Sequence, residues 1–203
     1  MEVERALADL AEVRDRLASC QQFRGYSGPA AACSGIGAIV AGIVQLIVAP
    51  YPATGGQIQT YILIWCVCLG IALAANYGAL ALWYARTAGM QARSQTRTAG
   101  LSILPAVILG AILSAALYLH GMYWMLPGAW YACYAVGLFA SRAMVPKHVA
   151  AAGVLFAFAG AALLLTPDTA LPLSWWVMPV GFGAVQTYIG WVLARDEDAR
   201  VSA

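Results

Sequence analysis

Residues 58–84 read IQTYILIWCVCLGIALAANYGALALWY and contain no Lys, Arg, Asp or Glu. A helix needs about 20 consecutive apolar residues to cross about 30 Å of hydrocarbon, because lipid cannot hydrogen-bond to an exposed backbone. This stretch is longer than that, and Arg86 lies just beyond its end. It therefore predicts a transmembrane helix.

Five other windows of the chain have the same apolar character. The composition agrees with them, because 62% of the residues are hydrophobic and 10% are charged, against about 25% charged in an ordinary soluble domain. The predicted spans are Ala30 to Ala49, Ile58 to Tyr84, Gly100 to Leu119, Met122 to Ser141, His148 to Thr166 and Ser174 to Ala194. We therefore predict an all-α fold, a six-transmembrane-helix bundle of a polytopic membrane protein.

The basic residues indicate how this bundle is oriented. All 11 Lys and Arg residues precede the first span, follow the sixth, or lie between spans 2 and 3 or 4 and 5. The connections 50–57, 120–121 and 167–173 contain neither residue. Cytoplasmic loops carry an excess of Lys and Arg. We therefore predict a multi-pass protein of the plasma (inner) membrane with cytoplasmic N- and C-termini.

The chain divides into three parts on this interpretation. Residues 1–29 form a cytoplasmic amphipathic helix and an elbow, residues 30–195 the transmembrane domain, and residues 196–203 a short cytoplasmic tail. The nearly balanced charges give no reason to expect nucleic-acid binding.

The leading segment is the most water-exposed part of the predicted protein. Between residues 2 and 20, apolar residues recur every three to four positions, and carboxylates outnumber arginines. An acidic face suits a protein surface better than anionic lipid. The predicted partner-binding residues are Leu7, Leu10, Leu17 and Arg24. The partner would be a cytoplasmic protein, the chain's own loop 86–98 or a second copy in a homo-oligomer; alternatively, the helix only packs across the bundle.

The elbow after this helix carries a resemblance to known proteins. Residues 23–29 read FRGYSGP and break the helix with two glycines and a proline. With the multi-span layout, they resemble a group of uncharacterised prokaryotic multi-pass membrane proteins that share an N-terminal amphipathic helix and an Arg-Gly-aromatic-Ser-Gly elbow. Members of that group are often encoded beside winged-helix regulators, so the resemblance implies a signalling or stress-response context.

The spans also show signs of internal repetition. The first span of each consecutive pair is rich in small residues, and Arg86, Arg142 and Arg195 follow the second at nearly equal intervals. This pattern predicts three parallel helical-hairpin repeats, although biased membrane composition alone would produce much of it. Two small-residue stripes, at residues 106, 110 and 114 and at residues 153, 157 and 161, predict packing seams within the bundle.

Aromatic residues gather near both predicted boundaries, where their amphipathic rings favour the membrane–water interface. The inner belt is Trp83, Tyr84, Tyr188 and Trp191, and the outer belt is Tyr51, Tyr61, Tyr123, Trp124, Trp175 and Trp176.

Few side chains within the spans could carry chemistry, since none is a carboxylate or a Lys or Arg. The neutral polar ones are Gln45, Asn76, Ser114 and Gln186. Each favours helix-to-helix hydrogen bonding. If the bundle encloses a pore or pocket, Asn76 and Gln186 are its predicted polar residues.

One candidate metal site lies at the predicted outer face. His120, Met122 and Met125, with Met178 nearby, offer nitrogen and thioether ligands that suit a soft metal such as Cu(I). The competing interpretation is that the methionines fill apolar space and the histidine is a wet interfacial side chain. We expect no bound cofactor.

Two functions compete on these observations. The first is a regulatory or interaction membrane protein that engages a cytoplasmic partner through its N-terminal helix. The second is transport, as a permease for a small neutral or lipophilic solute, suggested by the pseudo-repeats and by Pro105, Pro127 and Pro179 within the spans. No catalytic motif is visible, so we do not expect an enzyme, and a membrane-embedded enzyme ranks third.

Overall fold

The computed structural model describes residues 27–86, 90–142, 145, 147–167 and 171–201. Throughout these residues the regular structure is helical, which confirms the predicted all-α class. The elements are α2 (Gly28–Val48), α3 (Gly55–Arg86), α4 (Met90–Leu119), the 3₁₀ turn η1 (Tyr123–Met125), α5 (Leu126–Ala140), α6 (Lys147–Leu165), the π-helix η2 (Pro179–Val185) and α7 (Gln186–Val201). The predicted helix at residues 2–20 lies outside the described residues.

Three helical stretches are long and apolar enough to cross a membrane: Gly28–Val48, Gly55–Arg86 and Thr96–Leu119. Helical segments also occupy the other three predicted windows, but they are shorter or interrupted. The apolar part of α6, Ala151–Leu165, is too short by the same measure. The 3₁₀ turn precedes α5, and the π-helix precedes α7. The structure therefore shows an all-helical protein in which three helices are long and apolar enough to span a membrane. The six-span bundle stays a prediction.

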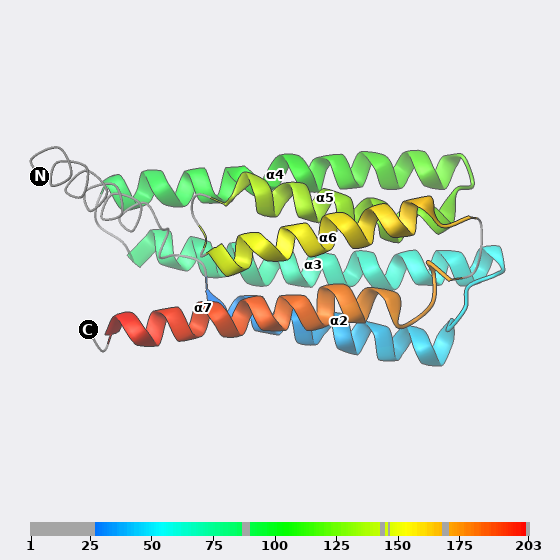
Figure 1. The fold of residues 1–203 in the computed structure, drawn as a ribbon, viewed down its shortest axis with the longest axis horizontal. Coiled ribbons are helices and arrows are strands. Elements are labelled where there is room, and N and C mark those ends of the chain that lie inside the picture. The colour runs from blue at the N-terminus through cyan, green and yellow to red at the C-terminus, as the bar shows by residue number, and fades with distance from the viewer. Residues whose placement is uncertain (1–26, 87–89, 143–144, 146, 168–170, 202–203) are drawn as a thin grey trace, which may run out of the picture.

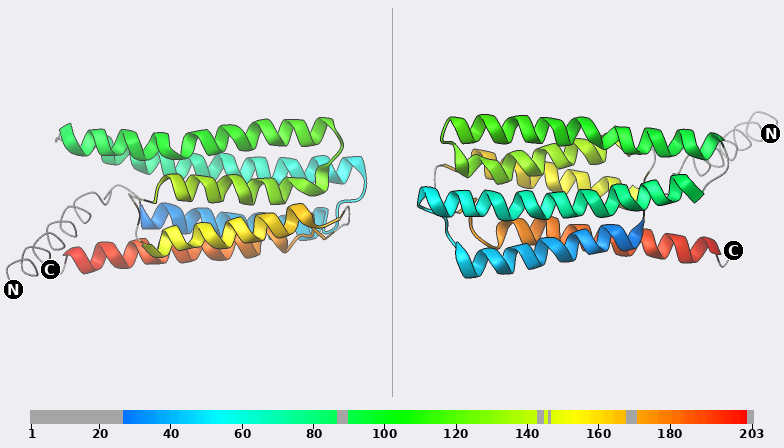
Figure 2. Two further views of the ribbon diagram at one scale, coloured as in Figure 1. Left: turned by 45° about the horizontal axis from the view of Figure 1, so that its top comes forward. Right: turned by 180° about the vertical axis from the view of Figure 1, so that it is seen from behind.

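The helices lie side by side along one axis (Figures 1 and 2). α2 packs between α3 and α7, and α5 packs between α4 and α6. The connections after α2, α4 and α6 lie at one end of the bundle (Figure 1). The C-terminal ends of α3, α5 and α7 lie at the other (Figure 1). Arg86 ends α3, Arg142 follows α5 and Arg195 lies in the C-terminal half of α7. The structure thus segregates these described arginines at one end, as the sequence predicts.

Only two of the three predicted hairpins are closely packed pairs of helices, and the internal repeats stay a prediction. α2 and α3 pack closely, as do α4 and α5, whereas α6 packs mainly on α5 and α7 mainly on α2. The third consecutive pair is therefore not a closely packed hairpin. Instead, α7, the last described helix, packs on α2, the first.

Glycines make the contact between α2 and α7 possible. Gly28, Gly35 and Gly42 recur every seventh residue on α2, and Gly183 of the π-helix and Gly190 of α7 have the same spacing. A Cβ atom at Gly190 would lie 2.5 Å from the backbone nitrogen of Ala32, and one at Gly35 would lie 2.5 Å from that of Thr187. Only glycine allows the two backbones to approach this closely.

α5 and α6 meet in the same way. A Cβ atom at Gly160 would lie 2.9 Å from the backbone nitrogen of Ala132, and one at Gly128 would lie 3.1 Å from the carbonyl oxygen of Gly160. Of the predicted stripe on α6, Gly153 faces α5 and Ala161 is exposed. The close contact on α6 therefore centres on Gly160, which the predicted stripe omits.

The other predicted stripe faces α5 throughout. A Cβ atom at Gly110 would lie 3.7 Å from that of Cys133, and one at Gly137 would lie 3.4 Å from that of Ala106. Ser114 accepts a hydrogen bond from the Trp130 indole at 2.7 Å. This stripe is therefore an intramolecular seam, as predicted.

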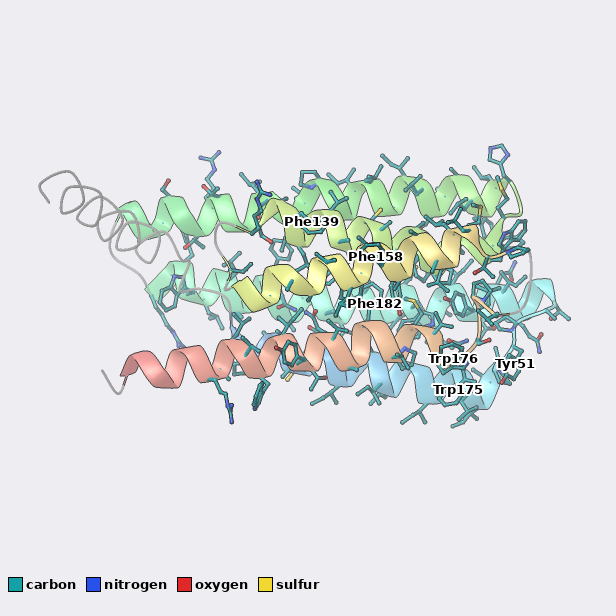
Figure 3. The ribbon with its side chains drawn as sticks, in the orientation of Figure 1. Tyr51, Phe139, Phe158, Trp175, Trp176 and Phe182 are labelled. Carbon is teal, nitrogen blue, oxygen red and sulfur yellow. The ribbon has the colours of Figure 1, made fainter. Side chains whose placement is uncertain are left out.

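Aromatic rings fill the space between the group formed by α2, α3 and α7 and the group formed by α4, α5 and α6. Tyr131 and Tyr134 of α5 each contact Phe156 of α6 and Phe182 of the π-helix, with ring centroids 4.7–5.3 Å apart. Phe182 points into the middle of the bundle, while Tyr51, Trp175 and Trp176 lie at the end away from the arginines (Figure 3). Burying these rings contributes a large share of the packing energy.

The prediction for Tyr61 is wrong. It belongs to the predicted outer aromatic belt, but the structure buries it completely. Its ring stacks on Trp130, with centroids 6.1 Å apart and planes 4° from parallel, and lies 6.5 Å from Trp65. The direction of this side chain depends on which neighbours α3 meets, and a position along one helix does not reveal them.

The glycine contacts yield a testable prediction. Gly35→Ala or Gly190→Ala forces backbone displacement and should lower stability by about 2 kcal/mol, as expected for overpacking. Gly37→Ala is the matched control on α2, because nothing lies within 4 Å of its Cβ position. That change should leave stability unchanged or raise it by up to about 1 kcal/mol through helix propensity. Unfolding of the purified chain in mild detergent measures both, and equal effects would contradict the close contact.

Candidate functional site

The four neutral polar side chains predicted within the spans all bond to neighbouring helices or segments, whereas the buried hydroxyl of Tyr61 has no hydrogen-bond partner among the described residues. Gln45 is completely buried. Its Nε2 donates to the Leu173 carbonyl at 2.8 Å, and its Oε1 accepts from the Trp65 indole at 2.9 Å. One glutamine thus joins α2, α3 and the segment before α7, where the Trp175 amide also donates to the Pro50 carbonyl at 3.1 Å.

Asn76 and Gln186, the predicted pore residues, are not brought together. The Asn76 amide donates to the Ser34 hydroxyl at 2.7 Å and to the Ala72 carbonyl at 2.8 Å, which ties α3 to α2. Gln186 accepts a hydrogen bond from the Tyr134 hydroxyl, which ties α7 to α5. Both are partly buried. Their observed role is helix-to-helix bonding, and their role as pore residues stays a prediction.

The contacts of Gln45 give a second testable prediction. Gln45→Met keeps the shape and leaves the Trp65 indole and the Leu173 carbonyl without this partner. A buried polar group that loses its partner costs about 1–3 kcal/mol, so the variant should unfold at lower temperature and shift Trp fluorescence. Gln59→Met, at an exposed position of α3, is the control and should do neither. Equal behaviour of the two variants would show that the buried bonds contribute nothing.

The predicted metal ligands lie around the turn between α4 and α5. His120 is exposed, whereas Met122 and Met125 are partly buried. Gly121 has a positive φ of 72°, which turns the chain sharply between the helices. Met178 is buried at the start of the π-helix. No group of three or more His, Cys, Asp or Glu residues gathers within the described part of the chain. The Cu(I) site stays a prediction.

A groove lies between α3 and α4 at the arginine-bearing end, with a volume of about 660 Å³. α3 contributes Tyr77, Leu80, Ala81 and Tyr84, and α4 contributes Arg93, Ser94, Thr96, Arg97, Gly100, Leu101 and Leu104. The two helices make few contacts with one another although both are long. This loose packing leaves the groove open.

Two contacts define the geometry of the groove. The Tyr77 hydroxyl donates to the Gly100 carbonyl at 3.0 Å, which ties the helices together within it. The Arg93 guanidinium lies 5.3 Å from the centroid of the Tyr84 ring, a cation–π distance. Arg93 and Arg97 are exposed and Thr96 is buried. The groove therefore combines positive charge, hydroxyl groups and apolar surface.

This groove was not predicted from the sequence. The basic residues after span 2 were expected in a loop, but Arg93 and Arg97 lie on α4. Tyr84 was expected only in an aromatic belt, and Tyr77, Thr96 and Leu101 were given no role. The recurrence of Arg93 and Arg97 at a spacing of four, just before an apolar span, was the available signal, because such residues share one helix face.

Comparisons with known proteins found no similar protein. No family model matches this chain, and neither do curated proteins or solved structures. The resemblance carried by the elbow at residues 23–29 therefore stays a prediction, and the elbow's last residue before α2, Ser27, caps that helix by accepting from the Ala30 amide at 3.3 Å.

Proposed function

We propose that this chain is a regulatory or interaction protein of the plasma (inner) membrane, in which six spans anchor residues 2–20 for capture of a cytoplasmic protein partner. One observation supports this best: the four neutral polar side chains predicted within the spans form hydrogen bonds between the bundle's own elements. Gln45, Asn76, Ser114 and Gln186 all make such bonds, and aromatic rings fill the space between the helix groups. The charged side chains that a partner could bind therefore lie at the arginine-bearing end.

The six spans are part of the proposal. Helical segments coincide with all six predicted windows, and the exposed surfaces of α2, α3 and α4 carry many large apolar side chains, such as Ile47, Leu63 and Ile112. Lipid favours this kind of surface, whereas water does not. By the positive-inside rule, the arginine-bearing end faces the cytoplasm.

Partner capture is tested by affinity purification from mild detergent with mass spectrometry of what is bound. The chain lacking residues 2–20, and the variant Leu7→Ala/Leu10→Ala/Leu17→Ala, should lose a stoichiometric partner while membrane abundance is unchanged. The control replaces three exposed leucines of the bundle, Leu46, Leu63 and Leu69, with Ala and should retain the partner. A partner held equally by all these proteins would refute the role of the N-terminal helix.

The rival function, a permease for a small neutral solute, is favoured by the π-helix Pro179–Val185 next to Gln186. Such segments often occur at functional sites. We expect proteoliposomes containing the chain to swell in glycerol or urea gradients no faster than empty vesicles, because its polar residues already bond to one another. Faster swelling that Asn76→Leu or Gln186→Leu abolishes, at unchanged protein content, would establish the permease instead.

A further inference from the structure

With α4 crossing the membrane as proposed above, the groove between α3 and α4 lies at the depth of lipid headgroups. The apolar stretch of α4 begins at Thr96, and the groove extends from Leu104 to Arg93. At a rise of 1.5 Å per residue, these positions lie about 16 Å apart along the helix axis. The headgroup layer on each side of a bilayer is about 5–8 Å thick. Leu104 therefore lies about 12 Å inside the apolar boundary at Thr96, beside the acyl chains, and Arg93 lies about 4.5 Å outside it, within the headgroup layer.

The chemistry of the groove changes along this direction. Leu101 and Leu104 are exposed at the deeper end, where acyl chains would lie. Arg93 and Arg97 are exposed at the shallower end. Among the described residues that line it there is no carboxylate. A ligand that matches both ends has an anionic head and an apolar tail.

The aromatic and guanidinium groups of the groove complement such a headgroup. Tyr84 lies under the Arg93 guanidinium, which positions the cation at the interface while apolar surface faces the lipid. Guanidinium groups hold phosphate through paired N–H donors. Basic pockets between transmembrane helices on the cytoplasmic side bind anionic lipid headgroups in this way.

We infer that the α3–α4 groove binds an anionic phospholipid, with its phosphate at Arg93 and Arg97 and an acyl chain along Leu101 and Leu104. The lipid fills the space that the loose packing of α3 on α4 leaves open. This site does not depend on partner capture by residues 2–20. It makes the arginine-bearing end sensitive to the composition of the surrounding leaflet.

The test uses the purified full-length chain in mild detergent, with native mass spectrometry measuring binding of phosphatidylglycerol and phosphatidylcholine. Arg93→Gln/Arg97→Gln should weaken phosphatidylglycerol binding about 30-fold, since each arginine near a membrane surface contributes about one kilocalorie per mole. Arg142→Gln/Arg195→Gln is the matched control. It removes two exposed arginines from the same end, one of them stacked on Trp191 at 4.0 Å, and should change binding less than threefold.

A second pair of variants tests the groove without changing its charge. Ala81→Trp adds bulk at an exposed position that lines the groove, whereas Ala74→Trp adds the same bulk two turns earlier on α3. Only the first should reduce phosphatidylglycerol binding, by about tenfold or more. Phosphatidylcholine should bind all the variants equally.

Three outcomes would overturn the inference. Equal losses in the two arginine pairs would mean general attraction to a positive end. Displacement of the lipid by millimolar glycerol phosphate would assign the site to a soluble anion. A tenfold gain in binding after neutralising Glu2, Glu4, Asp9, Glu12 and Asp15 to Gln or Asn would mean that the chain's own acidic segment is the occupant.

Discussion

The close approach of α2 and α7 is the constraint on which the rest of the bundle depends. It joins the first and last described helices through glycines spaced seven residues apart, so that backbone meets backbone without intervening side chains. In lipid there is little hydrophobic drive between helices, and close van der Waals packing replaces it. The contact sets where the segment before α7 must run. That segment then lies within reach of Gln45 and Pro50 of the first helical hairpin.

With α7 and the preceding π-helix held on α2, the Phe182 side chain of the π-helix reaches across to α5 and α6. Gly181 provides room for the Tyr131 ring, whose hydroxyl donates to the Val177 carbonyl at 2.7 Å. Phe182 completes the cluster with Tyr134 and Phe156. The contacts among these aromatic rings, together with the hydrogen bonds of Gln45, Asn76 and Gln186, organise the bundle. The α3–α4 pair receives no such close contact, and its looser packing leaves the arginine-lined groove.

Features that depend on a single helix could be predicted from the sequence. The apolar windows predicted the positions of the helices, and Pro29 and Ser27 agree with the start of α2 at Gly28. Features that depend on how two helices pack together were predicted less accurately. Tyr61 was expected at an interface and is buried, and the hairpin pattern did not reveal that α6 packs on α5 and α7 on α2. Asn76 and Gln186 were recognised as polar, but their partners Ser34 and Tyr134 lie 42 and 52 positions away in sequence.

The sequence by itself determined the helical class, the membrane-spanning character of the long apolar stretches and the gathering of described arginines at one end, because hydrophobic length and charge placement are local properties. Only the tertiary structure decided which helices pack together, which polar groups are satisfied and where a groove remains. These depend on the direction of each helix face, and a rotation of one residue, about 100° on an α-helix, exchanges a buried side chain for an exposed one.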